Sequence, residues 1–283
     1  KEYAASANQT ITSVSQYSAP QFESLRTLGE TIGHFPLLIG NRATMLQSGD
    51  ETYPAMLKAI DQAQRSIVLQ SYIFDHDSEG IKLADALERA QNRGVQIRVL
   101  IDAVGSKYSR PPMIRTLRKK KIPCALFMTN PLGMRMPYAN LRSHRKILVV
   151  DGEIGFTGGM NIRAGFVKAI AGEKATRDTH FCFEGPIVAQ LMAVFAHDWR
   201  FTTREVLPVD EWCGKQWDAA NGTVPARGIR SGPDRNIGSN HSMLLGAFAV
   251  AQSHIRIQSP YFLPDITLLG AIATAARRGI QVD

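Results

Sequence analysis

The alternation of apolar and polar positions along the chain predicts regular elements from about residue 53 onward. Helical periodicity alternates with short apolar runs, and Gly94 follows one helix at the position of a C-cap. The predicted elements are a helix at 53–64, a strand at 66–74, a helix at 80–92, a strand at 95–102, a helix at 111–120 and a strand at 123–128. Because strands alternate with helices, the pattern predicts an α/β domain on a mostly parallel sheet.

The N-terminal region is less regular. Residues 1–34 are polar and rich in small side chains, with one short amphipathic stretch at 22–28. No apolar run approaches the ~18–20 residues that a membrane helix needs, and the best candidate, at 35–39, is far too short. We therefore expect no membrane-spanning segment in the chain. It begins with Lys1 rather than Met, which leaves an upstream signal or anchor open.

An internal repeat is the strongest organisational signal. The segment AQRSIVLQSYIF at 63–74 aligns with AQSHIRIQSPYF at 251–262, an offset of 251 − 63 = 188 residues. Each copy continues into a predicted helix and an Arg-Gly turn, at 93–94 and at 278–279. The repeat predicts a duplicated domain. Since the second copy stops at Asp283 after barely one strand, helix and strand, we expect the sequence to be incomplete at its C-terminus.

Proline and glycine are concentrated between the two copies. The segment 207–230 contains two prolines and three glycines, which predicts an inter-repeat linker. The predicted organisation is an N-terminal segment at 1–35, a first repeat at 36–206, the linker at 207–230 and the start of a second repeat at 231–283.

Composition and charge narrow the class of protein and of partner. Of the 283 residues, 44% are hydrophobic and 20% are charged, which excludes an intrinsically disordered chain. The 33 Lys and Arg outnumber the 25 Asp and Glu, and the net charge of +8 favours an anionic partner: nucleic acid, an acidic membrane surface or a phosphorylated substrate. The three cysteines form no C-x-x-C pair, so neither a disulfide framework nor a structural zinc site follows, and a reducing compartment is favoured.

One segment combines residue types that suit phosphoryl chemistry. His144 and Lys146 directly precede the apolar run 147–150, a predicted strand, so in an extended chain both side chains point to one face. An imidazole can attack or protonate, while a neighbouring ammonium neutralises the charge that builds on phosphate oxygens. The glycines at 158–159 let the backbone approach an anion, and Asn161 can donate to a phosphate oxygen.

A His and a Lys two residues apart at the start of a strand usually lie on the surface without a catalytic role. The complete spacing here is H-x-K-x4-D-x6-G-G-x-N, which runs from His144 through Asp151 to Asn161 over 18 residues. This pattern resembles the His-Lys-Asp signature of the phospholipase D superfamily, with Gly159 where many members carry Ser. The internal duplication agrees with the resemblance, since most members carry two such repeats that share one active site.

The resemblance covers nearly the whole chain from about residue 36 and points to the bacterial cardiolipin synthase branch. The segments that carry it are GN at 40–41, YIF at 72–74, DAVGS at 102–106, NLRSHRK at 140–146, RDTH at 177–180, EGP at 184–186, SGPD at 231–234 and SPYFLP at 259–264. It implies the phospholipase D-like α-β-α sandwich, with a duplicated repeat whose second copy is incomplete in this chain.

The resemblance also implies a mechanism that uses neither a metal nor another cofactor. One motif histidine attacks phosphorus to give a covalent phosphohistidine, the other protonates the leaving alcohol, and the roles reverse with the acceptor. On this resemblance His144 is the nucleophile, while Lys146 and Asn161 hold the non-bridging phosphate oxygens. Asp151 completes the catalytic motif and is expected to fix local structure rather than to contact substrate.

The family also orients its histidine with a carboxylate from a later strand. Asp178, in the run RDTH at 177–180, is the candidate for this role. A carboxylate on the far ring nitrogen would fix the tautomer of His144 and stabilise its imidazolium. The alternative is an aspartate that makes a local turn at the start of a strand.

The second motif histidine is absent from the sequence. The offset between the two Arg-Gly turns is 278 − 93 = 185, and adding it to 144 places that histidine near 329, beyond Asp283. The chain is therefore expected to hold half an active site. We expect the other half from missing C-terminal residues or, as in the short nucleases of the superfamily, from a second chain. A degenerate second half also stays open.

Two further segments concern the partner. The basic run that contains Arg115, Arg118 and 119–121 is either a solvated helix end or a site for anionic headgroups. The loop at 127–138 is rich in Met and apolar residues. It either dips into a membrane interface, lines an acyl-chain groove or packs beneath the site.

Three functions compete. The first is a phosphatidyltransferase that joins phosphatidylglycerol to a second lipid alcohol, which the charge, the apolar loop and the family branch favour. The second is a phosphodiester hydrolase, either a phospholipase D or a nuclease; scattered aromatic residues disfavour the nuclease. The third is a non-catalytic membrane-binding homologue. For the first we expect an anionic membrane surface as partner, no specific nucleic acid, and a peripheral location on the cytoplasmic side of the bacterial inner membrane.

Overall fold

The structure is a computed structural model that describes residues 19–33, 35–128, 142–213, 222–232, 238–259 and 262–283. These residues form two compact units, each with its own core. The first unit extends over Leu38–Ala226, and the second comprises Arg227–Asp283 together with helix α2 (Phe22–Ile32). All the candidate site residues lie in the first unit.

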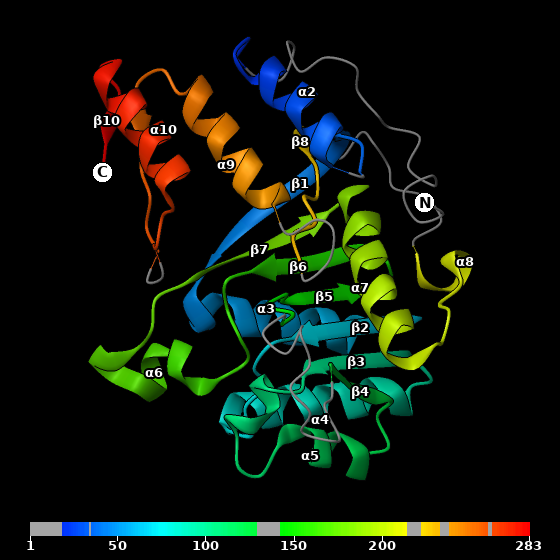
Figure 1. Ribbon diagram of the computed structural model, residues 1–283. Helices are drawn as coiled ribbons and strands as arrows, with labels where there is room; N and C mark the ends of the chain where they lie inside the picture. The colour runs from blue at the N-terminus through cyan, green and yellow to red at the C-terminus, as the bar shows by residue number, and fades with distance from the viewer. Residues whose placement is uncertain (1–18, 34, 129–141, 214–221, 233–237, 260–261) are drawn as a thin grey trace. The chain divides into compact units, whose positions relative to one another are not determined.

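A mixed sheet of eight strands organises the first unit, in the order β4-β3-β2-β5-β6-β7-β1-β8 (Figure 1). Its strands are β1 (Leu38–Gln47), β2 (Ser66–Ser71), β3 (Gln96–Asp102), β4 (Cys124–Phe127), β5 (Ile147–Val150), β6 (Ile154–Gly158), β7 (Thr179–Glu184) and β8 (Val224–Ala226). The β2/β3 and β3/β4 pairs are parallel, and the other pairs in this order are antiparallel.

The prediction of a mostly parallel sheet is wrong. Strands alternate with helices only from β2 through α4 (Ser78–Asn92), β3 and α5 (Met113–Lys119) to β4. After β5, Asp151 and Gly152 adopt φ of 54° and 68° and turn the chain straight back into β6. A parallel pair needs a crossover of a dozen or more residues, whereas two residues of positive φ fit a tight hairpin between antiparallel strands.

Helices cover both faces of this sheet (Figure 1). On one face α3 (Ser48–Gln62), α4 and α5 pack over an apolar core, into which α3 sends Met56 and Ile60, four residues apart. On the opposite face α7 (Ile187–Thr203) contacts β2, β4, β5, β6 and β7. The expected α-β-α sandwich is confirmed. Shorter elements are α6 (Lys168–Ala171), α8 (Val209–Trp212) and 3-10 turns at Gly105–Lys107, Ala164–Phe166 and Gly172–Lys174.

The second unit repeats part of the first. It contains α2, α9 (Ser239–Val250), β9 (His254–Ile255), α10 (Ile266–Arg277) and β10 (Gln281–Val282). β9 and β10 pair in parallel on either side of α10, as β2 and β3 do on either side of α4. The Gln96 N–H donates to the Arg65 carbonyl at 2.9 Å, and the Gln281 N–H donates to the Ser253 carbonyl at the same distance. The internal repeat is therefore also present in the backbone.

The caps and turns of the two crossovers agree as well. Asp77 and Asp265 begin α4 and α10, and each side chain accepts the N–H of the residue three positions on. Gly94 and Gly279 follow the two helices with φ of 91° and 85°, a conformation that favours glycine. These shared caps and turns explain why the repeat is visible in the amino-acid sequence.

The unit boundaries differ from those that composition predicts. The segment 207–230, predicted to be a linker, contains α8 and β8, and β8 pairs with β1 at the edge of the sheet. Helix α2, predicted within a separate N-terminal segment, packs on α9 in the second unit. Proline is rare in the interior of a sheet but occurs in edge strands. A proline-rich segment can therefore be either a linker or an edge strand, and composition alone does not distinguish the two.

Three further expectations concern the membrane and the cysteines. Within the described ranges, no helix is both long and apolar enough to cross a bilayer. Cys124, Cys182 and Cys213 are free thiols. The apolar loop at 127–138 lies outside the described residues except for 127–128, so its contact with lipid stays a prediction.

Candidate active site

The candidate catalytic segment enters β5 as an extended chain, so its side chains alternate between the two faces of the sheet. Ser143 and Arg145 point to the α7 side, where two buried residues hold them. Gln70 donates from Nε2 to Ser143 Oγ at 2.9 Å and to Asp198 Oδ2 at 2.8 Å. Arg145 donates from Nη1 to the same oxygen of Asp198.

Asp198 is a buried charge within this network, with only 3% of its surface exposed. Burial favours its protonation, but hydrogen bonds from His197 and Gln70 and the charge of Arg145 hold the pKa of Asp198 below its ordinary value. Removing one partner of a buried ion pair is strongly destabilising. The network therefore fixes the chain on both sides of position 144.

His144 lies on the opposite face, together with Lys146. Its ring stacks on Tyr72, with the two centroids 4.0 Å apart and the planes inclined by 17°. Partial burial lowers the pKa of His144, as does the charge of Lys146, while Asp102 opposes the shift. The imidazole is therefore neutral near neutral pH, which is the form that can act as a nucleophile.

Lys146 holds a positive charge beside that imidazole. Its Nζ donates to the His144 carbonyl at 2.6 Å and lies 5.8 Å from the centroid of the Tyr72 ring. Burial lowers the pKa of Lys146, and the charge of Asp178 opposes this effect. In its charged form the ammonium can neutralise phosphate oxygens, and Asp178 favours that form.

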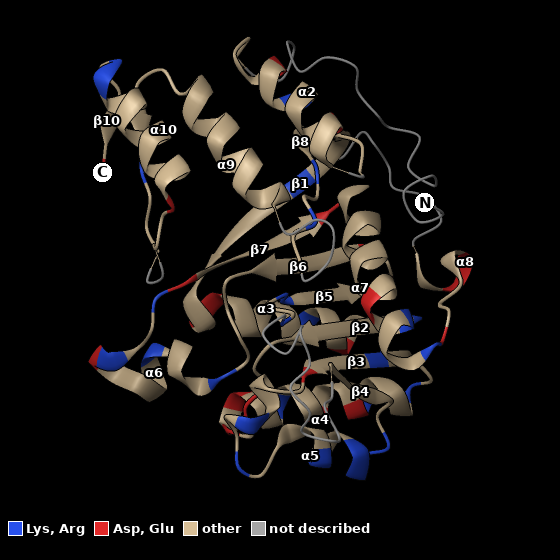
Figure 2. Ribbon diagram, viewed as in Figure 1, with Lys and Arg blue, Asp and Glu red and all other residues tan. Residues whose placement is uncertain are grey.

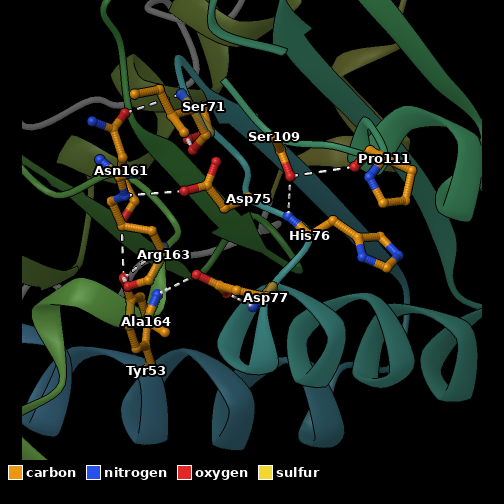
Figure 3. A network of polar contacts seen from close by, with 12 residues as sticks. Tyr53, Ser71, Asp75, His76, Asp77, Ser109, Pro111, Asn161, Arg163 and Ala164 are labelled. Carbon is orange, nitrogen blue, oxygen red and sulfur yellow. Dashed lines mark hydrogen bonds and ion pairs between the residues drawn. The ribbon is translucent and has the colours of Figure 1, made fainter. Parts of the chain in front are cut away.

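Asn161 lies in the loop after β6, and hydrogen bonds fix it beside the end of β2 (Figure 3). Its Oδ1 accepts the Ile73 N–H at 3.1 Å, and its carbonyl accepts the Tyr53 hydroxyl at 2.9 Å. The Ile162 N–H donates to the Ile73 carbonyl at 3.1 Å, which holds the two loops together. Because the side-chain oxygen has a protein partner, Nδ2 is the end of Asn161 that can donate to a phosphate oxygen.

Asp151 lies at the other end of β5 from His144. Its carboxylate accepts three backbone N–H groups at the start of β2. The donors are Gln64 at 2.9 Å, Arg65 at 2.7 Å and Ser66 at 2.8 Å. In the described part of the chain, these contacts join β5 to β2 and do not reach the imidazole.

Asp178 precedes β7 on the Lys146 side of the site. Its Oδ1 accepts the Thr179 N–H at 2.7 Å, and its charge raises the pKa of Lys146. A Cβ added at Gly159 would lie 2.3 Å from Asp178 Oδ1, so a serine there would displace the carboxylate. The structure brings Asp178 to Lys146 and Gly159, and among the described residues it forms no hydrogen bond with His144.

Sequence reasoning misses the residues that support the site. Tyr72 supplies the stacking surface for His144, and Asp102, at the end of β3, accepts the Ser143 N–H at 3.2 Å. Asp198 is a buried charge on the mostly apolar inward face of α7. A polar residue at the end of a buried strand or on a buried helix face is the signal for such residues, but it does not show which of them meet.

The chemistry of the described site rests on an imidazole, an ammonium and an amide. Among the described residues, no three His, Cys, Asp or Glu side chains gather in a way that could hold a metal ion. A metal-free reaction stays a prediction of the resemblance.

Known proteins share both the sequence and the fold of this chain. The cardiolipin synthase of Alkalihalophilus pseudofirmus is 32% identical over 255 residues, which are 90% of this chain and 51% of that protein. The cardiolipin synthase of Geobacillus thermodenitrificans is 33% identical over 264 residues, which are 93% of this chain and 53% of that protein. The chain thus spans about half the length of the curated relatives it matches. The structure of phosphatidylserine synthase from Haemophilus influenzae shares the fold, with a TM-score of 0.64 at 17% identity, covering 92% of this chain and 65% of that one.

A family match locates the shared region on the chain. The family described as "Cardiolipin synthase, PLD-like domain" matches residues 56–199, half of the chain. The matched range contains the motif from His144 to Asn161, and it also contains Asp178. Gln70 on β2 and Asp198 on α7, which hold the catalytic segment in place, lie in the same range. The chain belongs to this family of phospholipase D-like cardiolipin synthase domains.

Proposed function

We propose that the protein transfers a phosphatidyl group from phosphatidylglycerol to the alcohol of a second lipid, giving cardiolipin and glycerol. The observation that carries the proposal is the neutral imidazole of His144 beside the ammonium of Lys146, on one face of a rigid sheet. The names of the relatives and the net charge of +8 support an anionic lipid as substrate.

In the proposed reaction, His144 attacks phosphorus, and a nitrogen–phosphorus bond forms as the bond to the glycerol headgroup breaks. Lys146 and Nδ2 of Asn161 stabilise the charge on the non-bridging oxygens. A second motif histidine, which the family resemblance implies, protonates the departing glycerol and later takes a proton from the incoming lipid alcohol. That alcohol attacks phosphorus, and the nitrogen–phosphorus bond breaks to restore neutral His144.

The proposal places the protein at an anionic membrane surface, peripherally on the cytoplasmic side of the bacterial inner membrane. Lys and Arg gather at the end of α5 (Figure 2). Lys119 and Lys121 are exposed there, whereas Lys120 pairs with Asp85 and Glu88. An exposed cation near an acidic surface contributes about 1 kcal/mol of attraction, so this helix end supports contact with lipid headgroups.

The test follows lipid products by mass spectrometry. The protein as its gene encodes it is incubated with phosphatidylglycerol vesicles in the presence of a chelator. Cardiolipin and free glycerol from the wild type, both lost in His144→Asn, support the proposal. Lys146→Ala is expected to lower the rate at least about a hundredfold, because a contact to the transition state is lost. Circular dichroism checks that both variants fold.

Other products contradict the proposal. Phosphatidic acid alone means that water is the acceptor and that the protein is a phospholipase D. Cleavage of a nucleic acid without any lipid product indicates a nuclease, and no product of either kind indicates a non-catalytic membrane-binding homologue. A large loss of activity on adding the chelator contradicts the metal-free mechanism.

A further inference from the structure

A pocket between the loop after β3 and the first turn of α5 has no role in the reaction described so far. Its volume is about 420 Å³, and its lining residues are Lys107, Ser109, Arg110, Pro111, Pro112 and Arg115. We call it the cationic pocket. Sites for small ligands commonly enclose about 300–1,000 Å³, so the cationic pocket is large enough for a polar headgroup.

The charge of the cationic pocket is unbalanced. Its lining includes Lys107, Arg110 and Arg115 but neither Asp nor Glu. Among the described residues, the side chains of these three cations form no ion pair. A hollow lined by one sign of charge attracts the opposite sign, and the planar fork of arginine donors matches two oxygens of a phosphate. The cationic pocket therefore favours a phosphate group as ligand.

The cationic pocket lies at the same edge of the sheet as His144. The loops after β2 and β3 leave the carboxyl ends of two parallel strands, which meet at one edge. Because β5 runs antiparallel to β2, the segment that enters β5 lies at this edge as well. Tyr108, in the loop that lines the pocket, has its ring centroid 6.4 Å from that of Tyr72, which stacks on His144. Tyr72 is thus a common neighbour of the loop and of the imidazole.

Hydrogen bonds fix this loop to the catalytic segment. Asp102 Oδ1 accepts two backbone N–H groups at the start of the loop, at 2.8 Å and 3.2 Å. The other oxygen of the same carboxylate accepts the Ser143 N–H at 3.2 Å. Further along the loop, Ser109 Oγ accepts the His76 N–H at 2.6 Å (Figure 3). Since one carboxylate holds both segments, the cationic pocket has a fixed position relative to His144.

We propose that the cationic pocket binds the phosphate of the acceptor lipid, the second phospholipid whose alcohol attacks the phosphohistidine. The inference rests on the proposed phosphatidyl transfer. That reaction brings two anionic phospholipids to one site, where Lys146 and Asn161 hold the phosphate of the donor. The phosphate of the acceptor needs cations of its own, which Lys107, Arg110 and Arg115 supply. This second phosphate takes no part in making or breaking bonds.

Holding the acceptor by its phosphate affects which nucleophile reaches the phosphohistidine. Water and the lipid alcohol compete for the same phosphorus atom. A bound acceptor raises the effective concentration of its alcohol at that atom. The cationic pocket therefore favours transfer over hydrolysis, and the products report its occupancy.

The first experiment compares products rather than total rate. Arg110→Gln/Arg115→Gln removes two of the three cations, and the protein as its gene encodes it is incubated with phosphatidylglycerol vesicles. We expect the ratio of cardiolipin to phosphatidic acid to fall at least about tenfold, because contacts to a charged group are lost. Lys168→Gln/Lys174→Gln removes the same charge at exposed positions outside the pocket and is expected to keep the wild-type ratio.

A second experiment measures binding without turnover. In a His144→Asn/Lys146→Ala background, which removes the donor site, NMR follows the backbone amides at 107–110 and 115. The probes are glycerophosphoglycerol, the water-soluble headgroup of phosphatidylglycerol, and inorganic phosphate. We expect saturable shifts with glycerophosphoglycerol, and an affinity about tenfold weaker when Arg110→Gln/Arg115→Gln is added. If that variant does not fold, Lys107→Gln replaces it in both experiments.

The outcomes separate the two proposals. An unchanged product ratio in Arg110→Gln/Arg115→Gln overturns the acceptor site, as does an equal fall in Lys168→Gln/Lys174→Gln. Shifts with inorganic phosphate but none with glycerophosphoglycerol mean that the pocket takes free phosphate, which also overturns it. If the wild type forms no cardiolipin but glycerophosphoglycerol binds through these cations, phosphatidyl transfer is refuted while the phospholipid headgroup site stands.

Discussion

Two neighbouring side chains of one extended segment serve different purposes in this site. Arg145 points to α7 and is held by the buried Asp198, whereas His144 points the other way and stacks on Tyr72. That His144 shares a face with Lys146 is predictable from the sequence, since it requires only an extended chain. The partners Asp198 and Tyr72 are not predictable in this way, because those contacts depend on which elements become neighbours in the fold.

Removing the charge of Lys146 is expected to raise the pKa of His144. Burial is the largest cause of the lowered pKa of His144, Lys146 adds to it, and Asp102 opposes it. Lys146→Ala leaves burial and Asp102 in place, so the pKa of His144 moves up toward its ordinary 6.5. An NMR titration of the His144 ring measures the change. Lys168→Ala removes an exposed cation on α6 and is the matched control; a pKa that stays the same in Lys146→Ala contradicts the prediction.

At the scale of elements, turns and strand register determine which strands pair and in which direction, and local sequence patterns do not show this. The strand at 147–150 lies where its apolar run predicts. Its direction relative to its neighbours depends on the two residues of positive φ that follow it, which alternation of strands and helices does not reveal. Strand register also places Gly158 of β6 between Lys146, which precedes β5, and His180 of β7. No spacing along the chain indicates that these three residues are neighbours.

Loss of the Asp151 carboxylate is expected to destabilise the fold. Asp151→Ala leaves three N–H groups at 64–66 without their acceptor, which is expected to lower the free energy of unfolding by about 2 kcal/mol. Since these contacts lie at the far end of β5, kcat of the folded protein is expected to change little. Urea denaturation measures the loss, and Glu153→Ala, an exposed carboxylate in the same hairpin, is the control. Equal stability of the two variants argues against this assignment.

At the scale of the whole molecule, the second unit repeats the strand–helix–strand crossover that β2, α4 and β3 form in the first unit. The repeat is predictable because the same caps and turns, at Asp77 and Gly94 and again at Asp265 and Gly279, specify both copies. The pairing of β8 with β1 and of α2 with α9 is not predictable from the repeat. Both β8 and α2 lie outside the repeated segment, so only the folded chain shows where they pack.

The stability of the first unit is expected to fall in mild acid. The pKa of His180 is lowered from 6.5 to about 4, so between these values the unfolded chain binds a proton that the folded chain does not. The free energy of unfolding therefore decreases as the pH falls through this range, by about 3 kcal/mol if the whole shift is lost. Urea denaturation at several pH values measures the slope. His180→Leu is expected to flatten it and His254→Leu, at an exposed site, is not; an equal slope in both variants contradicts the prediction.

The glycine at 158 also limits how this site can vary among descendants of the chain. A side chain there would meet the Thr179 carbonyl and both the backbone and the ring of His180, each at 2.7 Å. Two of these three contacts are to backbone atoms, so a lineage that replaces the imidazole at 180 still has no room for a larger residue at 158. Selection on position 158 therefore comes from the path of the β7 backbone, and natural variants are expected to keep this glycine even where position 180 changes.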